Sequence, residues 1–135
     1  MNLRLGLCAA LILSFSLAGC GGSIGGPELG RVTGVVTLDG APLPDATVMF
    51  QPQNGRPSFG TTDSSGKYEL GYTQGSAGAV LGENTVFIRT EIPGPDGQPP
   101  VQKEKLPAKY HNKTELKANV VPGANTFNFD LTSKK

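Results

Sequence analysis

The sequence contains few of the residues from which metal and catalytic sites are usually built. Its 135 residues include one histidine, His111, and two cysteines, Cys8 and Cys20. A zinc site needs three or four converging ligands, and no matching cluster of residues accompanies the histidine. The turn sequence DSSG at 63–66 also lacks the alternating carboxylates of a calcium loop. We therefore expect neither a metal nor a cofactor.

Strong charge of one sign and long apolar runs are absent as well. The formal net charge is +1, and eleven basic and eleven acidic residues remain once Arg4 is set aside with residues 1–19. Nucleic-acid binding usually needs a basic patch, so we expect no nucleic-acid partner. The apolar run at 5–17 is shorter than the roughly 20 residues of a membrane-spanning helix. No segment shows sustained helical periodicity.

The first twenty residues have the layout of a secretory signal, with one basic residue, an uncharged apolar run and a small-residue end. The last four, Leu17-Ala18-Gly19-Cys20, resemble the bacterial lipobox, the recognition site of lipoprotein signal peptidase. The resemblance implies cleavage between Gly19 and Cys20 and lipidation of Cys20. Cys8 would leave with the signal, so the mature chain could form no internal disulfide. A plain secretory cleavage beside an incidental cysteine is the alternative.

A lipidated Cys20 would be held on a membrane without a spanning segment. Each buried methylene contributes about 0.8 kcal/mol, so two or three acyl chains give a lasting anchor. Residues 20–30 are glycine-rich and predict a flexible tether, with a reach of roughly 17 Å for ten residues. Glycine at position 21, where aspartate would signal inner-membrane retention, implies outer-membrane delivery. We expect a lipid-anchored protein of the cell envelope.

Alternating apolar and polar residues dominate the rest of the chain, and this period of two is typical of β-strands with one buried face. Between the runs lie turns rich in glycine, proline and aspartate. The pattern predicts seven strands, at residues 31–38, 45–51, 59–63, 67–72, 84–91, 115–121 and 125–132. Seven short strands at this spacing favour an antiparallel two-sheet β-sandwich that spans 31–132, followed by a short tail at 133–135.

One long connection interrupts the predicted strands. Residues 92–109 contain five prolines, which rules out an interior strand because proline removes ladder donors. We expect a long, solvated loop, and loops of this length in compact domains are usually functional or disordered.

The stretch VTGVVTLDGAPLPDATVMF at 32–50, followed by TTDSSGKYEL and GENTVFI, resembles the carboxypeptidase regulatory-like domain. The late stretch LPAKYHNKTELKANVVPGANTFNFDL resembles the ending of small bacterial lipoproteins of that family. This resemblance implies an all-β, transthyretin-like (prealbumin-like) sandwich. The matched pattern carries no catalytic residue, and its positions are Gly34, Val36, Gly40, Pro42, Ala46 and Val48.

The transthyretin-like fold raises one enzymatic possibility, the hydroxyisourate hydrolases. Their sites resemble a cluster of histidines and an arginine with a C-terminal Tyr-Arg-Gly-Ser. This chain has a single histidine and ends in Leu-Thr-Ser-Lys-Lys, so it lacks the histidine cluster and the C-terminal motif of those sites. The acidic residues are predicted at turns or solvated strand faces, like ordinary surface charges: Asp39, Asp45, Asp63, Glu69 and Asp130. We expect a protein that is not an enzyme.

Four residues are the candidates for a binding surface: Phe87, Tyr110, His111 and Arg56, with Phe59 as a further exposed aromatic. Phe87 is predicted to face away from the core side of its strand. Tyr110 either pins the long loop to the sandwich, which we prefer, or stacks on sugar. His111 is either a ligand or pH-sensitive contact, or a solvated or backbone-bonded side chain.

These observations favour a lipid-anchored, non-enzymatic β-sandwich that serves as a protein-binding or structural module. A carbohydrate-binding module is the alternative, and a transthyretin-like hydrolase is less favoured. The expected partners are the membrane, through the lipid anchor, and an envelope protein or polysaccharide.

Overall fold

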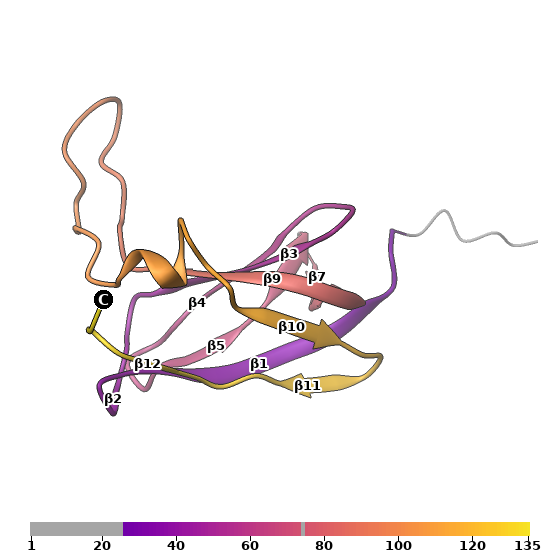
Figure 1. Cartoon of the computed structure of the whole chain (residues 1–135). Helices are drawn as coiled ribbons and strands as arrows, with labels where there is room; N and C mark the ends of the chain where they lie inside the picture. The colour runs from indigo at the N-terminus through magenta and orange to yellow at the C-terminus, as the bar shows by residue number, and fades with distance from the viewer. Residues whose placement is uncertain (1–25, 74) are drawn as a thin grey trace, which may run out of the picture.

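The structure of the protein is a computed structural model that describes residues 26–73 and 75–135 (Figure 1). The predicted signal peptide, Cys20 and most of the predicted tether lie outside the described residues. The described chain is all-β, with one short 3-10 helix, η1 (Ala108–Tyr110). None of the helical structure in this part of the chain is long and apolar enough to cross a membrane.

The described residues form twelve strands rather than the predicted seven. Five predicted strands are present, with ends within two residues of the prediction, and two are each divided in two at 70 and at 127–128. Three additional strands have only two residues each. The strands are β1 (Leu29–Leu38), β2 (Ala41–Pro42), β3 (Thr47–Pro52), β4 (Ser58–Thr61), β5 (Lys67–Glu69), β6 (Gly71–Thr73), β7 (Ser76–Ala77), β8 (Ala79–Val80), β9 (Gly82–Arg89), β10 (Lys117–Val120), β11 (Ala124–Thr126) and β12 (Phe129–Leu131).

The strands form two six-stranded sheets. In the first sheet, β1 is central and pairs with β11 and β12 along one edge and with β2, β5 and β8 along the other. The second sheet has the order β10-β9-β3-β4-β6-β7 and is antiparallel throughout. The first sheet differs from the all-antiparallel prediction, because β1 runs parallel to β11 and β12.

The parallel pairing follows from the turn between β10 and β11. The turn was predicted as a tight hairpin, yet its two strands pair with different sheets, because the turn carries the chain from one sheet to the other. Asn125 holds this crossing: its side-chain amide accepts a hydrogen bond from the Val121 amide (3.0 Å) and donates to the Arg31 carbonyl (3.0 Å). The chain therefore enters β11 at the end where β1 begins and runs beside it in the same direction.

Both sheets contribute one face to a single core. Val32 and Val36 of the first sheet and Val48, Phe50 and Ile88 of the second are fully buried. Strand alternation leaves the other face of each sheet toward solvent. The molecule therefore offers two outer sheet faces, whose side chains differ in chemistry.

The closest backbone approach lies at Gly34, in the middle of β1. A Cβ atom at this position would be 1.8 Å from the Phe127 carbonyl oxygen and 2.9 Å from Cε1 of Tyr68. The Tyr68 ring lies beside Gly34, its register partner, and its hydroxyl donates a 2.6 Å hydrogen bond to the Phe127 carbonyl. Burial raises the pKa of Tyr68, which keeps this donor protonated.

The two ends of the molecule carry different features. The described chain enters β1 at one end, and the long loop after β9 projects from the opposite end, where the C-terminus also lies (Figure 1). A tether attached before β1 would therefore hold the loop on the far side of the domain.

We predict that Gly34→Ala destabilises the protein by about 3 kcal/mol or more, because the new methyl group overlaps backbone that cannot move freely. Chemical denaturation measures this loss. Gly71→Ala is the matched control, because the nearest atom to its Cβ would be 4.0 Å away, and we expect a change within about 0.5 kcal/mol. Equal stability of the two variants would contradict the role given to Gly34.

Candidate functional site

A row of three apolar side chains crosses the outer face of the second sheet. Phe87 on β9 and Phe59 on β4 are both register partners of Met49 on β3. Phe59 is 50% exposed, and the other two are partly exposed. Side chains directly opposite on neighbouring strands are about 5 Å apart, so the row extends over about 10 Å. We call these three residues the apolar row.

Polar side chains border the apolar row on both sides. Arg89 and its register partner Thr47 lie toward the long loop, and the Arg89 guanidinium donates a 2.7 Å hydrogen bond to Oδ1 of Asn112. Gln51 and Thr85 are register partners on the other side. An apolar centre with a polar rim is the usual anatomy of a protein interface.

The long loop follows the end of β9 and is closed at its base by Glu104. The Glu104 carboxylate accepts hydrogen bonds from the Thr90 hydroxyl (2.7 Å), the Thr90 amide (3.0 Å) and the Leu106 amide (3.0 Å). Ile92 and Gln102 then pair with each other through their main chains, at 2.9 and 3.3 Å. The base of the loop is thus fixed, and residues 93–101 project beyond it.

The ionised form of Glu104 is the form that these donors stabilise. Partial burial raises the pKa of Glu104, but the hydrogen bonds from Thr90, Leu106 and Glu91 outweigh this effect and hold the pKa below its ordinary value of 4.5. A carboxyl whose pKa is lowered on folding contributes stability that is fully present above pH 4.5 and is lost as the pH falls through the lowered value.

We therefore predict that the loop base opens on acidification. The NMR amide signals of Thr90 and Leu106 should keep their positions from pH 7 to 5 and shift together below pH 4.5. At pH 7, Glu104→Gln should raise the amide hydrogen exchange of Thr90 by an amount equivalent to about 1–3 kcal/mol, whereas Glu91→Gln, an exposed neighbour, should not. Unchanged protection in the Glu104 variant would show that the carboxylate does not close the loop.

Tyr110 and His111, two of the predicted binding residues, are buried. Tyr110 is 8% exposed, and its hydroxyl accepts a 2.9 Å hydrogen bond from the Thr132 amide, which ties η1 to the end of the last strand. Nε2 of His111 lies 3.1 Å from the Leu106 carbonyl. Their contacts are internal, as in the structural alternatives stated above, so we do not include them in an exposed surface.

The other predicted residues are separated in space. Phe87 lies in the apolar row, with the outward orientation that the strand pattern predicted. Arg56 is exposed in the connection between β3 and β4, which lies at the end of the molecule where β1 begins. The structure therefore does not gather the four predicted residues into one site. Among the described residues, no three histidine, cysteine or acidic side chains are grouped so that they could hold a metal ion.

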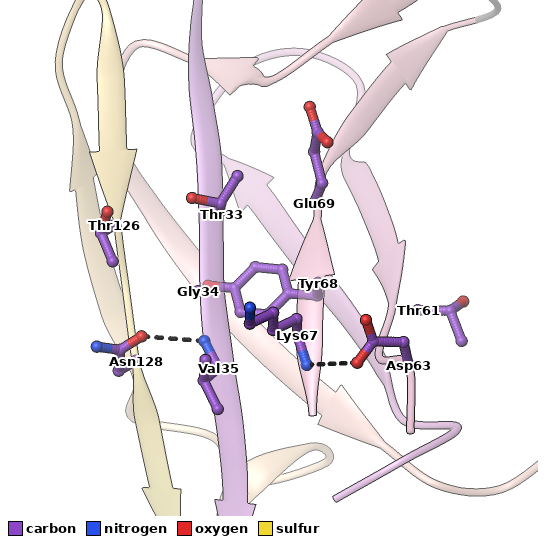
Figure 2. A pocket seen from close by; sticks show the side chains of 10 residues that line it. All are labelled: Thr33, Gly34, Val35, Thr61, Asp63, Lys67, Tyr68, Glu69, Thr126 and Asn128. Atoms are coloured by element: carbon purple, nitrogen blue, oxygen red, sulfur yellow. Dashed lines mark hydrogen bonds between the residues drawn. The ribbon is translucent and has the colours of Figure 1, made fainter. Parts of the chain in front are cut away.

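A groove of about 550 Å³, lined mainly by polar and charged residues, lies on the outer face of the first sheet (Figure 2). Its floor is β1, and its walls are β5 on one side and the segment through β11 on the other. Two rows of side chains cross it, one through Thr126, Thr33 and Glu69 and the other through Asn128, Val35 and Lys67. The lining residues are Thr33, Gly34, Val35, Thr61, Asp63, Lys67, Tyr68, Glu69, Thr126 and Asn128, and we call this site the sheet-one groove.

The two acidic side chains of the sheet-one groove already have partners. Glu69 forms an ion pair with Arg31 (2.9 Å) at the rim. Oδ1 of Asp63 accepts hydrogen bonds from the Ser65 hydroxyl (2.7 Å), the Ser65 amide (2.9 Å) and the Lys67 amide (3.0 Å), and these bonds hold the pKa of Asp63 below its ordinary value. In the described part of the chain, the Lys67 ammonium has no ion-pair partner.

The comparisons with known proteins identify no family. No family model matches the sequence, and no curated protein matches it. Among solved structures, the chain is similar to a DUF3823 family protein from Parabacteroides merdae ATCC 43184, with a TM-score of 0.45 and 14% sequence identity. The similarity covers 79% of this chain and 47% of that protein, so the chain spans about half of its length.

Several surface residues could not be selected from the sequence. Met49 alternates with the buried Val48 and Phe50, so an outward orientation was predictable, but its position between two phenylalanines depends on strand register. Thr33 and Thr126 are 93 residues apart and meet only because β11 runs beside β1. The sequence signal was the alternation itself, and the missing information was which strands are neighbours.

Proposed function

We propose that this protein is a lipid-anchored, non-enzymatic module of the cell envelope that binds another protein through the outer face of its second sheet. The apolar row carries this proposal. Aromatic residues, methionine and arginine are enriched at the centres of protein interfaces, and Phe59, Met49, Phe87 and Arg89 supply all three types on one face. A group of apolar side chains that remain at least partly exposed on a sheet face favours a contact surface.

The proposed anchor is consistent with a binding face that a partner protein can reach. Cleavage after Gly19 and lipidation of Cys20 would attach the chain to a membrane, most simply the outer membrane. The part of the predicted tether before Leu29 would lead into β1, which includes the last two residues of the tether. The long loop lies at the opposite end from that entry (Figure 1). An anchored domain would therefore keep its outer sheet faces and its loop accessible to a partner.

The size of the apolar row limits the kind of contact. A standard interface covers about 800 Å² on each partner, more than three side chains provide. The contact would then extend over the rim at Arg89 to the projecting residues 93–101, which leave the same end of β9. The two sheets on one core also fit the transthyretin-like, carboxypeptidase regulatory-like class that we propose for the fold.

The proposal is tested by photo-crosslinking in intact cells. A photoreactive phenylalanine analogue replaces Phe59 in one strain and Val121 in another, because Val121 is equally exposed (48%) but lies away from the apolar row. We expect the probe at position 59, and not the probe at 121, to capture one defined protein. Phe87→Ala in the same chain should reduce that capture about five-fold or more, which corresponds to at least 1 kcal/mol.

Capture of the same set of proteins from both positions would contradict a specific face. Capture at position 59 that persists in the Phe87→Ala chain would also contradict the proposal, because the row would then not be the contact. A crosslink between two copies of this chain would show that the face serves self-association and does not bind a different protein.

A further inference from the structure

We propose that the sheet-one groove binds a carboxylate-bearing glycan, such as a short segment of an acidic polysaccharide. This inference goes beyond the proposed function, because the groove lies on the other sheet from the apolar row. It rests on the arrangement of charge and hydrogen-bonding groups across β1.

Among the charged residues that line the groove, Lys67 is the one that favours an anionic ligand. Both carboxylates of the groove are engaged, Glu69 with Arg31 and Asp63 with its own turn. The Lys67 ammonium has no ion-pair partner among the described residues, and Figure 2 shows its side chain reaching from β5 toward Gly34, over the floor of the groove. A ligand carboxylate placed there would form a charge-assisted hydrogen bond with Lys67 without displacing an internal ion pair.

The remaining polar groups select a hydroxyl-rich ligand. Thr33 and Thr126 are register partners, and in the described part of the structure neither hydroxyl has a hydrogen-bond partner. Oδ1 of Asn128 accepts a 2.9 Å hydrogen bond from the Val35 amide, which leaves its NH₂ group, on the side away from β1 in Figure 2, as a donor at the edge of the groove. Two hydroxyls and an amide thus lie on the floor and along one wall of the groove, where they can exchange hydrogen bonds with the hydroxyl groups of a sugar ring.

The shape of the groove favours a glycan over a peptide. Gly34 shares the inward side of β1 with the buried Val32 and Val36, and the buried Tyr68 ring lies beside it beneath the floor of the groove. Val35 is the one aliphatic side chain of the lining, so the groove offers no set of apolar pockets for peptide side chains. An open, shallow groove on a sheet face suits a segment within a longer chain.

The test is an NMR titration of the full chain with three probes: trigalacturonate, neutral maltotriose and triglutamate. We expect trigalacturonate to shift the amide signals of Thr33, Val35, Thr126 and Asn128 more than either other probe. Lys67→Met should weaken its binding about five-fold, the effect of losing one exposed charge-assisted hydrogen bond, and Lys67→Arg should restore it to within about two-fold. Lys103→Met, which removes a charge from the long loop, should leave binding unchanged.

Each other result overturns the proposal. Equal weakening by Lys67→Met and Lys103→Met would show non-specific attraction to net charge. Equal shifts with maltotriose would remove the role of the carboxylate, and tighter binding of triglutamate would assign the groove to an acidic peptide. Because the apolar row is untouched in these variants, the crosslink from position 59 should persist in Lys67→Met. A failure of the groove proposal would therefore leave the protein-binding proposal standing, and the reverse also holds.

Discussion

The close contact among Gly34, Tyr68 and the Phe127 carbonyl is the constraint on which the rest of the structure depends. It brings β5 and the segment between β11 and β12 onto opposite edges of β1 at a spacing that a single side chain at position 34 would prevent. The Tyr68 hydroxyl satisfies the Phe127 carbonyl, which would otherwise be left without a partner in a partly buried position. Phe127 is then held so that its ring packs 5.7 Å from Phe50 of the second sheet.

One contact thus links the core to both outer faces. Below β1, the Phe50 and Phe127 rings join the two sheets. On the outer side of β1, Thr33 and Val35 alternate with Gly34 and form the floor of the sheet-one groove. On the far side of the core, Phe50 alternates with Met49, so the packing that fixes β3 also fixes the centre of the apolar row. The two faces therefore differ in chemistry, apolar on one sheet and polar on the other, on a single support.

Strand positions were largely predictable from the sequence, and strand neighbours were not. Alternation located β1 and β9 to within two residues, because their buried residues recur at every second position. It did not reveal that Leu70 separates strands of different sheets, since the alternation continues through that residue. The parallel pairing of β1 with β11 depends on the crossing held by Asn125, a contact across 94 residues that no local pattern encodes.

For the candidate sites, too, the orientation of a residue within its strand was predictable, and its neighbours on other strands were not. Phe87 was correctly placed on an outer face, because its neighbours Val86 and Ile88 are buried. For Tyr110 the sequence favoured a structural contact between the loop and the sandwich, and its hydroxyl accepts a hydrogen bond from the Thr132 amide. The full burial of His111 was not indicated, because it follows a proline-rich loop and has no strand alternation around it. The sheet-one groove requires three strands from distant parts of the chain, and its residues individually resemble ordinary surface threonines, lysines and acids.

The most direct test of the central claim, that the second sheet presents a protein-binding face, uses Met49 as a reporter. The chain has two methionines, Met1 and Met49, and Met1 belongs to the predicted signal peptide. The ¹³C-methyl signal of Met49 is predicted to shift or broaden on addition of a solubilised envelope fraction, and to return after that fraction is treated with protease. A Met49 signal that is unchanged by the fraction, or that responds equally before and after proteolysis, would contradict the account.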